Sequence, residues 1–308
     1  MGRVQAIGGV PFVFAMTLLA GAGARPLTAA EMAHPFTYDD KAPLDFRDAG
    51  QEAVEGATVH DISYASPKGG RVPGYLVVPP GSGPFAGIVY VHWGQGDRTE
   101  FLSEALLLAK SGVESLTIDA PFNRPEAERY DSVANPEKER DEYIQLVTDA
   151  RRAVDVLVAR PEVDKTRLGY VGHSLGATWG GPFAAVEKRV KAFVLMGGLP
   201  RLTDVLGDEP IAKMMQKAYS RDKLEAYIKV LAPIDPVHFV GQAEPESILF
   251  QFARHDRFIS ERAADEYVKA AGKPQQVRWY FTSHEFNDLQ SPVDRRAFLA
   301  RRLGFRAP

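Results

Sequence analysis

From residue 86 to the C-terminus, short apolar runs alternate with longer amphipathic stretches, and this alternation constrains the fold more than any other feature. Short runs of mostly apolar residues, without alternating polar positions, predict strands that are buried on both faces. Six such runs occur, at residues 86–92, 113–119, 167–171, 190–197, 247–253 and 276–282. Because helical stretches separate them, successive strands are expected to be parallel and joined by right-handed crossovers. The pattern therefore predicts an α/β fold with a mostly parallel sheet and helices on both faces.

The amphipathic stretches carry helix signals of their own. Asp97 is followed three residues later by Glu100, which predicts a capping box at the start of a helix that stops at Gly112. Residues 136–160 repeat apolar side chains at helical spacing, so a long helix is expected there. Further helices are expected after Ser174, after Ser260 and after Pro292.

The region before residue 86 is predicted to add a hairpin. Two β-patterned runs, residues 57–65 and 71–78, flank the turn-rich sequence SPKGG and predict two antiparallel strands. Together with the six later runs they predict an eight-stranded sheet within one domain, residues 57–308. Residues 25–56 are rich in Pro, Ala and Asp and are expected to wrap the surface without a core role.

One stretch, residues 199–245, interrupts the alternation of strands and helices. Residues 213–230 within it are helical in character. We interpret the stretch as an insertion between two strands and as a candidate lid.

The first 24 residues have the composition of a secretory signal peptide. Arg3 is their only charge, residues 7–24 are apolar or small, and Ala22-Gly23-Ala24 offers a cleavage site, with Thr28-Ala29-Ala30 as a second. The apolar centre, residues 10–19, is too short to span a bilayer. The sequence therefore predicts an exported protein, periplasmic or secreted, with no membrane segment after signal cleavage.

Charge and cysteine content exclude several function classes. The 37 Lys and Arg residues and the 40 Asp and Glu residues give a net charge of −3 without long like-charge runs, which argues against a nucleic-acid partner. Zero cysteine excludes disulfides, thiolate metal sites, a cysteine nucleophile and lipid attachment through an N-terminal cysteine. No HxH, HExxH or carboxylate comb marks a metal site, and no cofactor is expected.

The sequence Gly172-His173-Ser174-Leu175-Gly176 has the pattern GxSxG between a predicted strand and a predicted helix. A serine hydroxyl is a useful nucleophile only when a turn exposes it near a base and oxyanion donors. Glycines two residues away on either side leave room for a sharp strand-to-helix turn. We therefore interpret Ser174 as a nucleophile, the alternative being a structural Gly-rich turn. His173 is interpreted as a packing residue.

The acid and base expected with such a serine follow it in the chain, in the order Ser, Asp or Glu, His. Asp256 follows the strand at 247–253 and is predicted to be the acid, the alternative being a loop or capping carboxylate. Of the seven histidines, His284 alone follows this acid at the end of a strand, so it is predicted to be the general base rather than a solvated loop residue. Four carboxylates are weaker candidates for the acid: Asp119, Asp204, Asp235 and Glu285.

Two backbone N–H groups are expected to bind the oxyanion, one from the residue after the serine and one from the loop after the strand at 86–92. The first belongs to Leu175. For the second we predict Trp93, with the Gln95 side chain as an additional donor. The alternative for this loop is a Gly-containing turn that only starts the next helix.

Aromatic residues close to these positions are candidates for the substrate pocket. Phe122 and Trp179, with Trp93, are predicted to line an acyl or alcohol pocket, the alternative being that they are core residues. Arg124 and Arg129 allow two interpretations, a site for an acidic substrate or a solvated face.

Residues 163–176, VDKTRLGYVGHSLG, together with the acid and base that follow, resemble the alpha/beta-hydrolase superfamily from about residue 57 to the C-terminus. The nucleophile region is similar to the branch that contains dienelactone hydrolases, acetyl xylan esterases and the catalytic domain of prolyl oligopeptidases. The resemblance implies that fold and the roles assigned above to the serine, acid, base and two amides. Dienelactone hydrolases use a cysteine where this chain has Ser174. Prolyl oligopeptidases carry an N-terminal propeller, for which this chain has too few residues before the sheet.

These features predict an exported serine hydrolase that cleaves small-molecule carboxylic esters through an acyl-enzyme intermediate. The same residues suit a peptidase or a thioesterase. In a different class, they suit a non-catalytic binding protein on a hydrolase scaffold. No oligomeric state is predicted.

Overall fold

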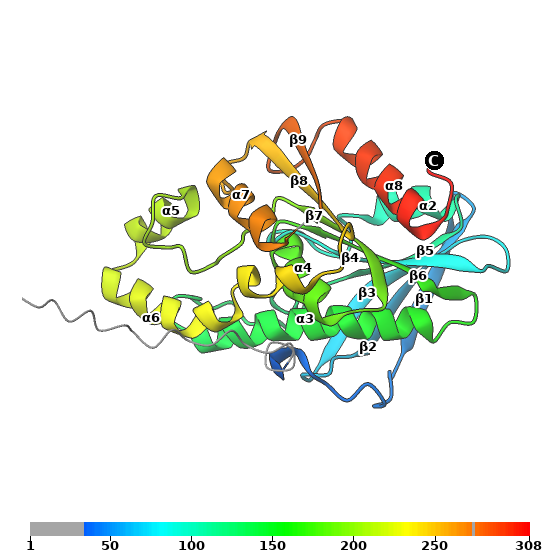
Figure 1. Cartoon of the computed structure of the whole chain (residues 1–308). Helices are drawn as coiled ribbons and strands as arrows, with labels where there is room; N and C mark the ends of the chain where they lie inside the picture. The colour runs from blue at the N-terminus through cyan, green and yellow to red at the C-terminus, as the bar shows by residue number, and fades with distance from the viewer. Residues whose placement is uncertain (1–33, 273–274) are drawn as a thin grey trace, which may run out of the picture.

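The computed structural model describes residues 34–272 and 275–308, which form one nine-stranded sheet with helices on both faces (Figure 1). The strands are β1 (Arg47–Val54), β2 (Ala57–Ala65), β3 (Arg71–Val78), β4 (Phe85–Val91), β5 (Val113–Ile118), β6 (Val163–His173), β7 (Val190–Met196), β8 (Ile248–His255) and β9 (Gln276–Ser283). The α-helices are α2 (Leu102–Ala109), α3 (Pro136–Val158), α4 (Leu175–Val186), α5 (Pro210–Ala218), α6 (Arg221–Leu231), α7 (Glu261–Ala270) and α8 (Gln290–Leu303). The 3₁₀ turns are η1 (His34–Phe36), η2 (Pro121–Asn123), η3 (Ala232–Ile234), η4 (Pro236–His238) and η5 (Val240–Gln242).

The strand order across the sheet is β1-β2-β3-β5-β4-β6-β7-β8-β9. The pairs β1–β2, β2–β3 and β3–β5 are antiparallel, and all the others are parallel. The order reverses at β4, which has β5 on one side and β6 on the other. In open α/β sheets, ligands bind outside the carboxyl ends of the strands at such a reversal. The α/β fold, the hairpin and the six later strands are confirmed. The expected burial of residues 276–282 is wrong, because β9 is an edge strand in which only Tyr280 is buried.

The prediction of eight strands is wrong by one, because β1 lies within residues 25–56. This edge strand pairs with β2, and all of its residues except Val54 are exposed. A strand with both faces in water has no apolar alternation, so its sequence gives no strand signal. Its place in the sheet comes from backbone hydrogen bonds to β2.

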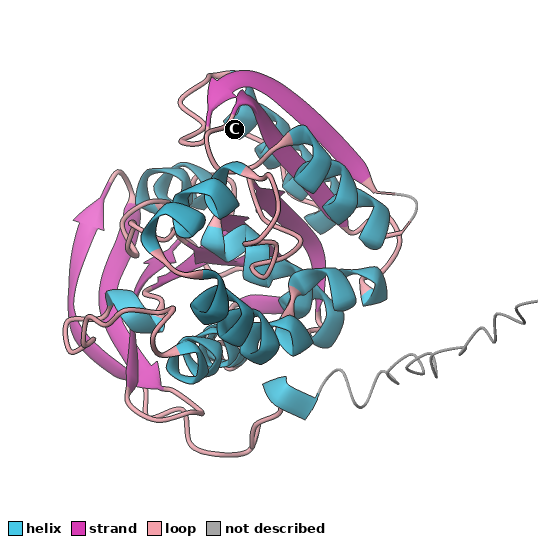
Figure 2. Ribbon diagram, turned by 90° about the vertical axis from the view of Figure 1, so that its left-hand side faces the viewer, coloured by secondary structure: helices cyan, strands magenta, loops and turns pink. Residues whose placement is uncertain are grey.

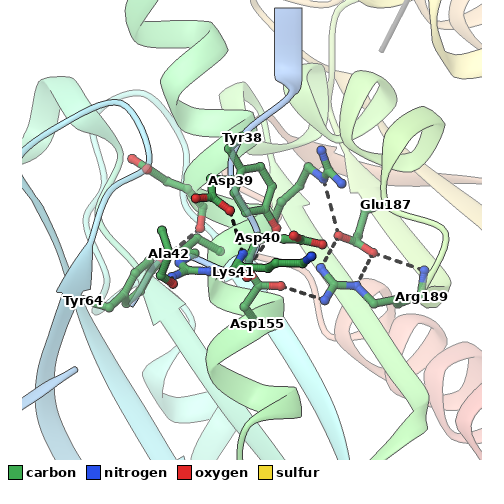
Figure 3. Close-up of polar contacts among 12 residues, drawn as sticks. Tyr38, Asp39, Asp40, Lys41, Ala42, Tyr64, Asp155, Glu187 and Arg189 are labelled. Carbon is green, nitrogen blue, oxygen red and sulfur yellow. Dashed lines mark hydrogen bonds and ion pairs between the residues drawn. The ribbon is translucent and has the colours of Figure 1, made fainter. Parts of the chain in front are cut away.

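The segment before β1 is fixed to the domain by a buried aromatic ring and by a group of polar contacts, and Figure 3 shows the polar contacts. Phe36 is 0% exposed and packs edge-on against Phe239. Tyr38 donates to Asp155 on α3 at 2.9 Å, and the same carboxylate accepts from Arg189 at 2.7 Å. Burying a phenylalanine side chain contributes about 1.5–3 kcal/mol. The expectation that residues 25–56 have no core role is therefore wrong.

Two groups of helices cover the sheet. α3, α4 and α7 pack on one face, α2 and α8 pack on the other, and the sheet twists between them (Figure 2). Every residue of β4 and β5 is buried, as expected for central strands covered on both faces. This packing fixes the carboxyl ends of the parallel strands, where the predicted site residues lie.

Residues 199–245 contain two helices, α5 and α6, where residues 213–230 were expected to be helical. The helices are separated at Tyr219 and Ser220, which have extended backbone angles. Asp235 holds the insertion together, because its carboxylate accepts from the Leu202 N–H at 2.8 Å and from the Thr203 hydroxyl. Burial raises the pKa of Asp235 to about 6.

The predicted signal peptide, residues 1–24, lies outside the described residues. Within residues 34–272 and 275–308, no helix combines the length and the apolar composition that crossing a bilayer requires.

Candidate active site

Ser174 occupies a strained turn between β6 and α4. Its φ is +49° and its ψ is −101°, a backbone conformation that residues with a Cβ rarely adopt. Gly172 and Gly176 make the turn possible, because a Cβ on Gly172 would collide with the Gly176 backbone and a Cβ on Gly176 with the Val91 carbonyl. The Ser174 N–H donates to the Met196 carbonyl at 2.6 Å, which ties the turn to β7. The sequence pattern thus corresponds to a nucleophile elbow.

We predict that Gly176→Ala lowers the free energy of unfolding by about 3 kcal/mol, because β4 and α4 must move apart to admit the methyl group. Gly94→Ala is the matched stability control, since a Cβ there meets nothing within 4 Å. Urea unfolding of both variants measures the effect. An unchanged midpoint for Gly176→Ala would show that the elbow is not tightly packed.

The structure brings Ser174, His284 and Asp256 into one hydrogen-bonded chain. His284 Nε2 lies 2.7 Å from Ser174 Oγ, and His284 Nδ1 lies 2.7 Å from Asp256 Oδ2. A carboxylate only accepts, so Nδ1 carries the proton and Nε2 is free to accept from the serine hydroxyl. The side chains of His284 and Asp256 are only 1% and 2% exposed.

Backbone contacts orient the Asp256 carboxylate. Its Oδ1 accepts from the N–H groups of Phe258 and Ile259 at 2.8 and 3.0 Å, which turns Oδ2 toward His284. Asp256 follows β8 and His284 follows β9, so parallel pairing of these strands brings the predicted acid and the predicted base to the same edge of the sheet.

The weaker candidates for the acid are engaged elsewhere. Asp119 accepts from the Arg98 N–H, Asp204 pairs with Arg262, Asp235 bonds within the insertion, and Glu285 pairs with Arg257. Across residues 34–272 and 275–308, no group of three or more potential ligand side chains is placed to hold a metal ion.

Leu175 and the loop after β4 supply backbone N–H groups next to the serine. Leu175 is the first residue of α4, so its N–H has no acceptor within the helix and lies at the positive end of the helix dipole. Trp93 does not keep its predicted role, because its N–H donates to Glu100 Oε2 at 2.8 Å. The next N–H along the chain is that of Gly94, which lines the same pocket as Ser174.

The peptide unit between Trp93 and Gly94 is held by His92. The Ala120 N–H donates to His92 Nε2 at 3.0 Å, so Nδ1 carries the ring proton and donates it to the Trp93 carbonyl at 2.6 Å. Burial lowers the pKa of His92, which favours this neutral ring. Because carbonyl and N–H of one peptide unit point in opposite directions, holding the Trp93 carbonyl fixes the direction of the Gly94 N–H.

The predicted capping box of α2 is absent. The helix begins at Leu102 without a side-chain cap, and Asp97 instead accepts from the Thr99 N–H within its own turn. Glu100 turns toward the site, where it contacts Trp93 and also His173 Nδ1 at 2.5 Å. The capping-box interpretation assigned Glu100 to the helix alone and did not place it in the site. The only signal in the sequence was His173, a polar ring next to Ser174 that needs a hydrogen-bond partner if it is buried.

Two pockets adjoin at the site, and Ser174 lines the smaller one. The smaller has a volume of about 170 Å³ and is lined mainly by apolar side chains, including Leu199, Ile211, Phe258 and Ile259. The larger, of about 850 Å³, is lined mainly by polar and charged residues. Gly94 and Gln95 line both.

The predicted pocket residues divide between pocket and core. Phe122 lines the larger pocket, whereas Trp179 is 1% exposed and stacks on Tyr143 in the core, so its predicted pocket role is wrong. Arg124 also lines the larger pocket, but its side chain is largely buried in an ion pair with Asp149, which neutralises its charge. Arg129 lines the larger pocket.

A family model described as acetyl xylan esterase matches residues 31–239. The chain belongs to the acetyl xylan esterase family. The activity named for this family, carboxylic ester hydrolysis, is the class that the sequence predicts for this chain. The matched region of this family member includes Ser174 and ends before Asp256 and His284.

Solved structures with the same fold include two acetyl xylan esterases. The enzyme from Paenibacillus sp. R4 superposes with a TM-score of 0.70 at 18% identity, over 88% of this chain and 92% of that one. Acetyl xylan esterase 1 from Thermoanaerobacterium has a TM-score of 0.68 at 14% identity, over 87% and 91% of the two chains. These likenesses show the alpha/beta-hydrolase fold.

A curated relative matches part of the chain. Acyl-coenzyme A amino acid N-acyltransferase 2 of Rattus norvegicus is 32% identical over 136 residues, which is 44% of this chain. The match spans only 29% of the relative's length.

Proposed function

We propose that this protein is an exported esterase that removes acetyl and other short acyl groups from a polar alcohol through a Ser174–His284–Asp256 triad. The observation that carries the proposal is the hydrogen-bonded chain from Asp256 through His284 to Ser174, at 2.7 Å per step. Export rests on the signal-like sequence of residues 1–24.

In the proposed reaction, His284 takes the Ser174 proton as the hydroxyl oxygen attacks the ester carbonyl. The Gly94 and Leu175 N–H groups stabilise the oxyanion of the tetrahedral intermediate. His284 then protonates the leaving alcohol, and an acyl-enzyme remains on Ser174. Water, activated by the same histidine, attacks the acyl carbonyl and restores the serine. Asp256 keeps the Nδ1 proton in place throughout.

The two pockets favour a short acyl group and a polar alcohol. At about 30 Å³ for each water-sized group, the smaller pocket of about 170 Å³ accommodates a short acyl chain. The larger, polar pocket suits a hydroxylated leaving group. Both features agree with the acetylated carbohydrate named for the family. Residues 199–245 act as a partial lid over the acyl side, through Leu199 and Ile211.

We predict that kcat/KM for p-nitrophenyl esters falls about 100-fold from acetyl to octanoyl, because the longer chain exceeds the smaller pocket. Ile211→Ala should recover part of the octanoyl activity, since it enlarges the pocket without touching the triad. Equal rates for both esters would contradict the acyl assignment.

Acetylated xylo-oligosaccharide, an aminoacyl p-nitroanilide and an acyl thioester are assayed in parallel. The partial likeness to acyl-coenzyme A acyltransferases makes the thioester the strongest competing substrate. A higher kcat/KM on the thioester or the anilide would replace the ester proposal. Failure of all the substrates and of fluorophosphonate labelling would favour a binding protein.

A further inference from the structure

Glu100 and His173 form a hydrogen-bonded, largely buried pair next to the proposed triad. His173 Nδ1 lies 2.5 Å from Glu100 Oε1, and His173 Nε2 lies 2.8 Å from the backbone carbonyl of His284. The other oxygen, Glu100 Oε2, accepts from the Trp93 N–H at 2.8 Å. The His173 side chain is 4% exposed and the Glu100 side chain is 20% exposed. Three loops of the site therefore meet at one pair of side chains.

The hydrogen-bond partners determine where the protons lie. A carbonyl oxygen only accepts, so His173 Nε2 must carry a proton directed at His284. The Trp93 N–H only donates, so Glu100 Oε2 must accept. A single proton then lies between Nδ1 and Oε1, and the pair as a whole is neutral. A charge-assisted hydrogen bond of this kind is stronger than a neutral one.

Neither residue lines the two pockets, so neither is placed to touch substrate. The pair instead binds the backbone of two loops. Glu100 binds the loop that contains Gly94, and His173 binds the loop that contains His284. The Trp93 ring stacks on His173, with 5.9 Å between centroids and 13° between planes, and closes the arrangement.

We propose that Glu100 and His173 are positioning residues that hold the oxyanion loop and the His284 loop in register with Ser174. The inference rests on the proposed triad and adds two residues to the machinery. His92 and Glu100 together bind the Trp93 carbonyl and N–H, so the loop is fixed on both sides of this residue. Because catalysis depends on tenths of an ångström at the oxyanion donor and the base, loss of the pair lowers the rate of the chemical step.

Glu100→Ala is expected to lower kcat about 100-fold while KM stays within about twofold, because the pocket walls are unchanged. Glu100→Gln is expected to stay within about fivefold of wild type. Its amide oxygen can accept from Trp93, and its amide N–H can donate to a neutral His173, so all three hydrogen bonds survive.

His173→Phe removes both ring hydrogen bonds and keeps an aromatic ring against Trp93. It is expected to lower kcat about 30-fold. The Glu100→Ala/His173→Phe double variant should be no slower than the slower single variant, since both changes break the same connection. Glu285→Gln is the matched control, because this carboxylate neighbours His284 in sequence but pairs with Arg257.

Thermal unfolding shows which variants are folded. If Glu100→Ala does not fold, the kcat values of Glu100→Gln and His173→Phe are compared instead to test the positioning role. A kcat for Glu100→Ala within threefold of wild type would overturn the proposal. So would an equal loss in Glu100→Gln, a rise in KM matching the fall in kcat, or a similar loss in Glu285→Gln.

The rate of Ser174 labelling by a fluorophosphonate separates this inference from the proposed function, because labelling needs the oxyanion site and base but no particular ester. A wild-type protein that is labelled but leaves acetyl esters intact contradicts the substrate proposal alone. Labelling rates of the variants then test the positioning role, with the same order expected as for kcat.

Discussion

Replacing Ser174 with alanine is expected to lower kcat for p-nitrophenyl acetate by about four orders of magnitude or more. The change removes Ser174 Oγ, the atom that lies 2.7 Å from His284 Nε2 and is proposed to attack the ester, so no acyl-enzyme can form. Residual turnover would come from the oxyanion donors and from binding alone. Fluorophosphonate labelling, followed by peptide mass spectrometry, should place the label on Ser174 in the wild type and find none in the variant.

Ser220→Ala is the matched control, because this serine precedes α6 without a side-chain hydrogen bond to the helix. It should retain full activity. The Ser174→Ala variant should unfold at a temperature close to that of the wild type, since alanine keeps the Cβ in the strained turn and only one hydroxyl group is lost. Substantial ester turnover by a folded, uncontaminated Ser174→Ala protein would refute the nucleophile assignment.

Asp256→Asn is expected to lower kcat about 10⁴-fold at neutral pH, with little change in geometry. The amide oxygen can keep the two N–H bonds from Phe258 and Ile259, which leaves the amide N–H₂ facing His284 Nδ1. Nδ1 must then accept, the ring proton moves to Nε2, and His284 can no longer take the Ser174 proton. Stopped-flow or steady-state assays of the purified variant measure the loss.

Asp204→Asn serves as the comparison, because it removes a competing carboxylate that pairs with Arg262 in the insertion. Its kcat should remain within threefold of wild type. A larger loss in Asp204→Asn than in Asp256→Asn would transfer the acid role to the insertion.

The parallel sheet was predictable because its central strands, such as β4 and β5, are buried on both faces and therefore appear in the sequence as uninterrupted apolar runs. The Ser174 elbow was predictable because the sharp turn demands glycine at 172 and 176. Chain order then singled out Asp256 and His284, which parallel pairing of β8 and β9 places together.

Other features leave no periodic signal in the sequence. Strand β1 is exposed on both faces, and Phe36 is one buried ring in an irregular segment. Trp179 could not be assigned to core or pocket without the fold, because an aromatic ring suits both.

The loop after β4 was misread for a different reason. The spacing of Asp97 and Glu100 suits a capping box, but a carboxylate can satisfy a distant N–H equally well. Tertiary contacts with Trp93 and His173 decided the outcome, and the same contacts removed the Trp93 N–H from the oxyanion site.

Gln95 lines both the small apolar pocket and the large polar one. If the smaller pocket binds the acyl group and the larger one the alcohol, as proposed, a substitution of Gln95 changes the acyl preference and the alcohol preference together. Ile211 and Arg129 each line only one pocket. Laboratory evolution that starts from those two positions can therefore adapt the enzyme to a new acid or a new alcohol independently, and leave Gln95 for last.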